Sequence, residues 1–100
     1  MILKSILEYL RAQRIACWRM NVIGVPMPDG RFRPNKEMVG VADICCIIQG
    51  KSVWLEVKTQ KGKQTDKQKV FEQTVKQAQG HYYIVRSIED AKKAISGITK

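Results

Sequence analysis

The sequence predicts a single α/β domain in which a mixed β-sheet is flanked by helices. Three observations support this prediction. Apolar residues change their spacing along the 100 residues in the order helix, three strands, helix, strand, helix. A tight turn joins the second and third strands as a hairpin, and the helix after them has the position of a right-handed parallel crossover. The length suits one domain over residues 1–100, since such a chain buries roughly 60 to 70% of its unfolded surface.

The first segment is predicted to be an amphipathic helix over residues 2–14. Its apolar positions recur at intervals of three and four residues: Leu3, Ile6, Leu7 and Leu10. Ala16 to Val22 follows as a strand. Residues 23–39 contain all 3 prolines of the chain, so we expect a long loop there, of a kind that is usually functional or mobile.

Two strands rich in β-branched residues form the centre of the predicted sheet. They are Val41 to Ile48 and Val53 to Val57. The segment between them, Gln49-Gly50-Lys51-Ser52, has the composition of a hairpin turn. A turn centred on its first two residues places Ile48 opposite Lys51.

Three charged residues interrupt these apolar strands. Counting back from that turn places Asp43 directly opposite Glu56, with their Cβ atoms roughly 5 Å apart. A turn shifted by one residue at each end would instead oppose Asp43 to Lys58 and Glu56 to Cys45. Either register keeps Asp43, Glu56 and Lys58 on one face, because side chains alternate along a strand.

The second half of the chain predicts a helix, a strand and a helix. Thr65-Asp66-Lys67-Gln68 has the spacing of a capping box, and Gly80 is the expected stop of that helix. Its expected apolar face consists of Val70, Phe71, Thr74, Val75 and Ala78. His81 to Arg86 is the last strand, and Ser87 to Asp90 opens a final helix.

The acidic pair predicts a cation site. Ionised groups on buried strands cost several kcal/mol unless they are paired or hold a metal. Two opposed carboxylates repel each other, so one takes up a proton or a cation lies between them. Asp43 and Glu56 are hard oxygen ligands suited to Mg²⁺ or Mn²⁺, and Lys58 compensates only part of their charge. The competing interpretation is a structural ion-pair network.

The charge of the chain favours a polyanionic partner. It carries 18 basic and 9 acidic residues, for a net charge of +9. Two basic groups flank the suspected site in the sequence: Arg31, Arg33 and Lys36 before it, and Lys61, Lys63, Lys67 and Lys69 after it. Beside an acidic metal site we interpret them as phosphate contacts, although a lysine run alone is usually a solvated face.

Other classes of protein fit the sequence less well. No apolar run approaches the roughly 20 residues of a membrane span, and the start lacks a signal-peptide layout, so we expect a cytoplasmic protein. Cys17, Cys45 and Cys46 form no Cys-X-X-Cys motif and are expected to be free thiols rather than zinc ligands. His81, the only histidine, is expected to begin a strand rather than to act as a catalytic base.

The acidic pair belongs to a longer ordered pattern. Trp18-Arg19-Met20-Asn21 stands on the first strand, Gly40 precedes Asp43, and Glu56-Val57-Lys58, Gln68, Phe71 and Arg86-Ser87 follow. This order resembles the stand-alone virus-type replication-repair nuclease (VRR-NUC) domains of the PD-(D/E)XK nuclease superfamily, over most of the chain. The resemblance implies a PD-(D/E)XK restriction-endonuclease-like core in the order α-β-β-β-α-β-α.

The same resemblance implies an activity and its residues. It implies a Mg²⁺-dependent DNA endonuclease, with Mn²⁺ as a substitute, that acts as a homodimer on branched DNA such as four-way (Holliday) junctions. Asp43, Glu56 and the carbonyl of Val57 would hold the metal. Lys58 would orient the attacking water, since a lysine with a pKa near 10.4 is a poor base at neutral pH. A bacterial or phage origin is implied as well.

Some positions depart from the family or keep two interpretations. Ala42 stands where the family often has proline, and the usual glutamate of the first helix is represented only by Glu8, which comes late and is better explained as a solvated charge. Gln68 has the spacing either to cap its helix or to reach the active site. Trp18 and Trp54 are most simply core or interface residues, with base stacking as the alternative.

Two rival functions remain open from the sequence. One is a non-catalytic module that binds nucleic acid through its basic residues, with a structural acidic pair. The other is a nuclease of the same fold that acts on specific sequences or on DNA ends.

Overall fold

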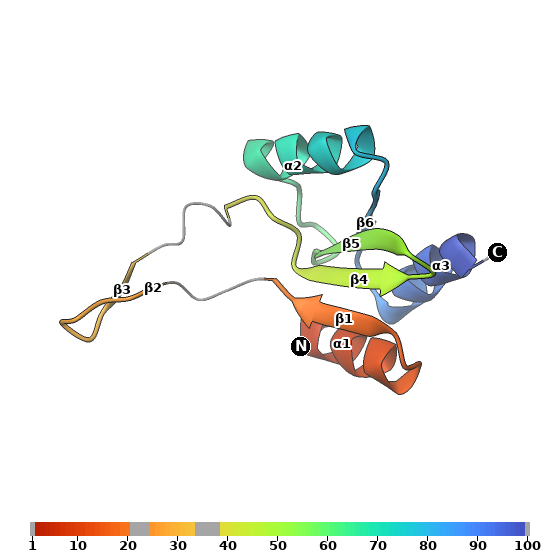
Figure 1. Cartoon of the computed structure of the whole chain (residues 1–100), viewed down its shortest axis with the longest axis horizontal. Coiled ribbons are helices and arrows are strands. Elements are labelled where there is room, and N and C mark those ends of the chain that lie inside the picture. The colour runs from red at the N-terminus through yellow and green to blue at the C-terminus, as the bar shows by residue number, and fades with distance from the viewer. Residues whose placement is uncertain (1, 21–24, 34–38, 100) are drawn as a thin grey trace.

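The computed structural model describes residues 2–20, 25–33 and 39–99 as a four-stranded mixed sheet flanked by helices (Figure 1). The strand order is β1-β4-β5-β6, with β1 (Ala16–Arg19), β4 (Ile44–Ile48), β5 (Lys51–Val57) and β6 (His81–Val85). The first three strands are antiparallel neighbours, and β6 is parallel to β5. The helices are α1 (Ile2–Ala12), α2 (Asp66–Gln77) and α3 (Ile88–Thr99). The expected α/β class, hairpin and parallel crossover are therefore confirmed.

The larger apolar core lies on the sheet face that carries α1 and α3. It joins Leu3, Ile6, Leu7 and Leu10 of α1 and Ala91, Ala94, Ile95 and Ile98 of α3 to apolar residues of β4, β5 and β6. A smaller cluster on the opposite face joins Val75 and Phe71 of α2 to Trp54, Tyr82, Ile84 and Ala42. Alternate residues of the same strands thus serve two different faces.

The β4–β5 hairpin has the first of the two expected registers. Ile48 pairs with Lys51, and the pairing continues to Ile44 opposite Leu55. Gln49 and Gly50 both have positive φ, 52° and 79°, as a two-residue turn between twisted strands requires. The register that would oppose Asp43 to Lys58 is excluded.

Several predicted boundaries were wrong. The expected loop over residues 23–39 contains a short antiparallel pair, β2 (Val25–Pro26) and β3 (Phe32–Arg33), while positions 21–24 and 34–38 lie outside the described residues. The helix predicted over residues 2–14 ends at Ala12, because Arg14 has a left-handed φ of 60°. Among the described residues, no helix is long and apolar enough to cross a membrane.

The apolar face predicted for α2 was wrong in part. Val75 is buried and Phe71 half-buried, but Val70, Thr74 and Ala78 are exposed. The residues of α2 that pack in the smaller cluster are Phe71 and Val75, which meet residues of β5 and β6 and Ala42, so this contact covers only part of the predicted face.

Gly80 is not the left-handed stop of α2, because Gln79 takes the positive φ of 66°. Gly80 is needed for close packing instead. A Cβ atom there would stand 2.8 Å from both the Ser52 hydroxyl oxygen and a Val75 methyl group.

Candidate active site

Asp43 lies where β4 and β5 part. Continuing the register by one pair places it opposite Glu56, and alternation from the hairpin turn makes this a non-hydrogen-bonded pair, the type with the shorter Cα separation of about 4.5 Å. The Val57 amide donates to Asp43 Oδ2 at 2.9 Å. In a continued ladder that amide would donate to a backbone carbonyl of β4, so the carboxylate replaces the ladder at this point. The Asp43 carbonyl in turn accepts from the Met20 amide at 2.7 Å.

Gly40 explains how the segment before Asp43 approaches α2. Its φ is +87°, and an added Cβ would stand 2.7 Å from the Lys67 carbonyl oxygen. A larger residue would therefore push this segment away from the first turn of α2. Gly40 and Lys67 together fix where Asp43 enters the sheet.

Glu56 is the only charged residue buried among those described, with 2% of its surface exposed. Its Oε2 atom accepts from Gln68 Nε2 at 3.2 Å and lies 3.7 Å from Lys58 Nζ. Its buried Oε1 atom has no hydrogen-bond partner among the described residues. Burial, first, and then the neighbouring Asp43 carboxylate raise the pKa of Glu56 to about 8, against the opposing effect of Lys58.

Gln68 caps its helix and also contacts Glu56. Its Oε1 atom accepts from the Thr65 amide at 2.9 Å, while the Gln68 amide donates to the Thr65 hydroxyl at 3.2 Å, which completes the capping box. Its Nε2 atom then remains free to donate to Glu56. The amide group of the Gln68 side chain, with one acceptor and one donor, thus links the start of α2 to the acidic pair.

The Val57 carbonyl points toward the same opening. The next amide, of Lys58, donates to the Val85 carbonyl of β6 at 3.0 Å. The described chain has no cis peptide bond, and in a trans peptide the C=O and N–H groups point in opposite directions. The Val57 carbonyl is therefore directed away from β6, to the side where β4 has left the ladder.

The basic residues divide into two groups. Lys61, Lys63, Lys67 and Lys69 are exposed on the loop after β5 and the first turns of α2, close in sequence to Lys58 and Gln68. Arg31, by contrast, lies on the β2–β3 hairpin, which projects away from the sheet (Figure 1), and its side chain is 86% exposed beside Asp29 at 3.5 Å. Arg33 belongs to β3, and Lys36 lies outside the described residues. The structure does not bring Arg31 to the acidic pair.

Arg86 is a site-supporting residue whose role the sequence analysis did not identify. Its Nη1 atom donates to the carbonyls of Thr59 at 2.5 Å and Gly62 at 2.7 Å, and so holds the lysine-bearing loop after β5. The sequence marks Arg86 only as the end of the last strand and as part of the Arg86-Ser87 pair in the family resemblance. Hydrogen bonds from an arginine to backbone carbonyls require no particular spacing of residue types, so the sequence could not predict them.

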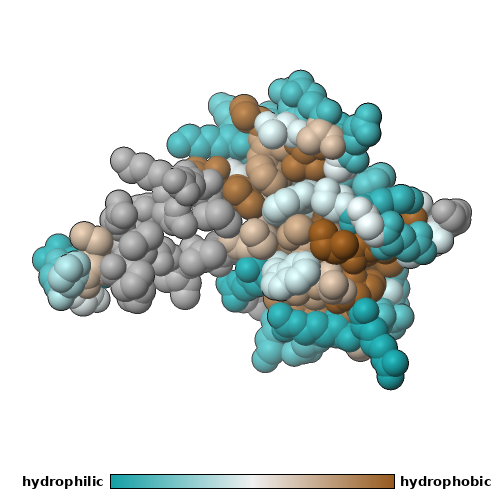
Figure 2. Space-filling view, in the orientation of Figure 1, coloured by the Kyte–Doolittle hydropathy of each residue, from teal (hydrophilic) through white to brown (hydrophobic). Residues whose placement is uncertain are grey.

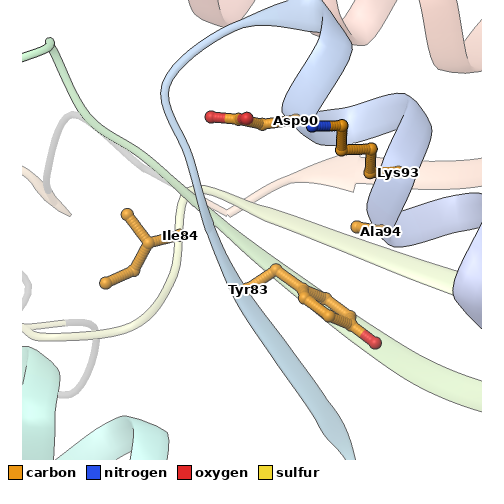
Figure 3. Close-up of a pocket in the computed structure, with 5 residues that line it drawn as sticks. All are labelled: Tyr83, Ile84, Asp90, Lys93 and Ala94. Atoms are coloured by element: carbon orange, nitrogen blue, oxygen red, sulfur yellow. The ribbon is translucent and has the colours of Figure 1, made fainter.

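Two hollows lie away from the acidic pair. One, of about 340 Å³, is lined by Leu3, Lys4, Leu7, Glu8, Arg11 and Arg19. Glu8 is exposed there, as expected of a solvated charge. The other, of about 270 Å³, lies between β6 and α3; Figure 3 shows its lining residues, with Tyr83 and Ile84 on opposite sides of the strand. Its Asp90 already accepts from the Arg86 amide at 2.8 Å.

The acidic pair fits a hard divalent cation. Two carboxylates, one with an unpartnered buried oxygen, and a carbonyl directed to the same opening are oxygen donors of the kind that Mg²⁺ and Mn²⁺ prefer. Within residues 2–20, 25–33 and 39–99, no three His, Cys, Asp or Glu side chains gather as a metal site. Water and substrate oxygens would have to supply the remaining ligands.

Comparison with known proteins adds no relative: no protein-family model, no curated protein and no solved structure matches this chain.

Proposed function

We propose that this chain is a Mg²⁺-dependent DNA endonuclease with a PD-(D/E)XK core of the VRR-NUC kind. The observation that carries the proposal is the buried Glu56 carboxylate, opposite Asp43, with one oxygen that has no partner among the described residues. A buried polar atom without a partner costs roughly 1 to 3 kcal/mol, more for a charged group. A bound cation would remove that cost.

A purely structural ion-pair network explains this arrangement less well. Lys58 is the one cation paired with Glu56 among the described residues, at 3.7 Å, while the neighbouring Asp43 adds a second negative charge beside Glu56. A network that served stability alone would be expected to satisfy both oxygens of Glu56. The raised pKa of Glu56 also argues against a purely structural network, since it means that the protein on its own does not fully stabilise the ionised carboxylate.

Each group has a role in phosphodiester hydrolysis. Asp43, Glu56 and the Val57 carbonyl would hold Mg²⁺ or Mn²⁺. When bound, such an ion polarises the phosphoryl oxygens and lowers the pKa of a bound water. Lys58, half-buried beside Glu56, positions the attacking water and offsets negative charge that develops on the phosphate. Gln68 keeps the Glu56 carboxylate in one orientation.

The exposed lysines supply the DNA contacts in this proposal. Lys61, Lys63, Lys67 and Lys69 are exposed and lie close in sequence to Lys58 and Gln68. Phosphate contacts of this kind give affinity that falls steeply with salt. The preference for branched or four-way junction DNA and the homodimer rest on the resemblance to VRR-NUC domains.

Cleavage of a panel of labelled substrates tests the function: a four-way junction, a flap, a linear duplex and a single strand, each with Mg²⁺, Mn²⁺ or EDTA. We expect metal-dependent cleavage, with the junction cut fastest. Asp43→Asn and Glu56→Gln should each reduce the rate by about 100-fold or more while junction binding persists.

Asp66→Asn is the matched control, because Asp66 is an exposed carboxylate at the start of α2. It should cleave like the unaltered chain. Binding without metal-dependent product on any substrate would contradict the proposal and favour the non-catalytic module. Preferential cutting of a linear sequence or of ends would instead assign the fold to another nuclease activity.

A further inference from the structure

One row of side chains crosses the sheet on the α2 face. The strand registers pair Trp18 with Cys45, Cys45 with Trp54, and Trp54 with Tyr82. Exposure falls along this row, from 53% at Trp18 to 6% at Tyr82. The row is therefore aromatic at both ends but covered at only one.

Helix α2 covers the β5–β6 end of the row. Phe71 meets Trp54 edge-on at 5.0 Å between ring centroids and Tyr82 at 6.2 Å. At the β1–β4 end, Ile47 is 44% exposed beside Trp18. Figure 2 shows apolar atoms at the surface over β4, below α2 in that view.

Trp18 is adjacent to the acidic pair. Because it lies directly opposite Cys45, its diagonal neighbours are Ile47 on β4 and Asp43 just before β4, about 7 to 8 Å away. The hydrogen bond from the Met20 amide to the Asp43 carbonyl, at 2.7 Å, ties the end of β1 to the site residue itself. The exposed indole and the acidic pair thus lie on one face of the sheet, with Asp43 one strand and Glu56 two strands away from Trp18.

The chemistry of this surface favours a nucleobase over a second copy of the chain. A stable interface between copies needs about 800 Å² from each partner. The large apolar side chains exposed at this end of the row, among the described residues, are Trp18 at 53% and Ile47 at 44%, and even a wholly buried aromatic side chain covers only about 150 to 250 Å². That area suits one base. The chain carries a net charge of +9, which complements the phosphates on either side of such a base.

We propose that Trp18 stacks on an unpaired nucleobase of the DNA strand whose phosphate lies at Asp43 and Glu56. The phosphate part rests on the proposed function; the stacking part does not. Bases inside a duplex already stack on each other, so a free face is presented only by an unpaired nucleotide or by the terminal pair of an open duplex end. The substrate class is therefore DNA with an unpaired or displaced base beside the cleaved bond.

Binding measured in Ca²⁺ or EDTA tests this proposal without cleavage. The probes are a single strand and a branched DNA with 2-aminopurine at an unpaired position, and a duplex of the same sequence whose ends are closed by hairpins. Trp18→Leu should weaken binding of the unpaired probes by about 5- to 100-fold and abolish quenching of the 2-aminopurine fluorescence. Duplex binding should change less than twofold, and Trp18→Phe should retain most of the quenching.

Ile47→Ala is the matched control, because Ile47 is an exposed apolar residue on the same face but on the side of Trp18 away from Asp43. It should change unpaired-probe binding less than twofold. Equal binding by Trp18→Leu, or an equal loss on duplex, would overturn the proposal. Loss of a dimer in both Trp18→Leu and Ile47→Ala, measured by light scattering, would assign the surface to a second copy. Stacking without any cleavage would contradict the nuclease activity alone.

Discussion

The two faces of the sheet use the same strands for different purposes. On the α1–α3 face, Ile44 and Leu55 pair with each other and are fully buried among apolar residues. On the α2 face, the next pair along these strands is Asp43 and Glu56, with an unpartnered carboxylate oxygen. The α1–α3 face therefore provides the stability that lets the other face keep two repelling carboxylates.

The largest expected effect is a loss of unfolding stability when the core on the α1–α3 face is disrupted. Leu55→Ala removes a fully buried side chain from the core and should lower the free energy of unfolding by about 2 to 5 kcal/mol. Urea denaturation followed by circular dichroism measures it. Val70→Ala is the control, because Val70 is 62% exposed on α2. A loss below about 1 kcal/mol for Leu55→Ala would mean that this face does not carry the stability of the fold.

A second change separates the two roles of Gln68. Gln68→Glu keeps an acceptor for the Thr65 amide, so α2 should keep its cap, but it replaces the donor to Glu56 with a third carboxylate. We expect unfolding stability to change little at low pH and cleavage to fall by about 10- to 100-fold.

Gln68→Ala should lose both contacts, and so it should also destabilise the helix start by about 1 kcal/mol. Parallel rate and stability measurements on the two variants distinguish the roles. Full activity in Gln68→Glu would show that the hydrogen bond to Glu56 does not support the site.

The raised pKa of Glu56 predicts how the metal-free protein responds to pH. Below about pH 4.5 the carboxyl group is protonated in both the folded and the unfolded chain, so it costs nothing. Between there and a folded pKa of about 8, the unfolded chain releases the proton while the folded chain keeps it, so stability falls as pH rises.

Glu56→Gln should lack this dependence. The difference in unfolding free energy between the variant and the unaltered chain, measured in EDTA, should therefore grow from pH 5 to pH 8 in favour of the variant. A constant difference over this range would show that Glu56 is ionised without penalty.

The smallest expected effect concerns Arg86. Arg86→Ala frees the carbonyls of Thr59 and Gly62 and should loosen the lysine-bearing loop. We expect a loss of junction affinity of only a few-fold and faster hydrogen exchange confined to this loop. Arg86→Lys should restore part of the lost junction affinity and of the protection from exchange. Unchanged exchange would show that other contacts hold the loop.

Local patterns made much of the site predictable. The two-residue turn at Gln49 and Gly50 fixed the register, and the register alone brought Asp43 to Glu56. Capping-box spacing gave Gln68 one role, and its direction toward the sheet gave the other. The PD-(D/E)XK core and the nuclease activity stay predictions.

The sequence could not predict which apolar side chains stay exposed, because that depends on how much of each face of the sheet another element covers. Periodicity placed Val70 on an apolar face, but α2 contacts β5, β6 and Ala42 through Phe71 and Val75 and leaves Val70 exposed. For the same reason Trp18 is exposed while Trp54 packs against Phe71. The sequence likewise could not predict that Arg31 lies on a projecting hairpin, because residues near in sequence to Asp43 need not lie near it in space.

A cation site at Asp43 and Glu56 is tested most directly by counting bound Mn²⁺ with electron paramagnetic resonance at pH 7, without DNA. We expect at least one Mn²⁺ bound per chain, lost or weakened about 10-fold or more in both Asp43→Asn and Glu56→Gln but retained in Asp66→Asn. Identical Mn²⁺ binding in all four proteins would contradict a cation site at Asp43 and Glu56.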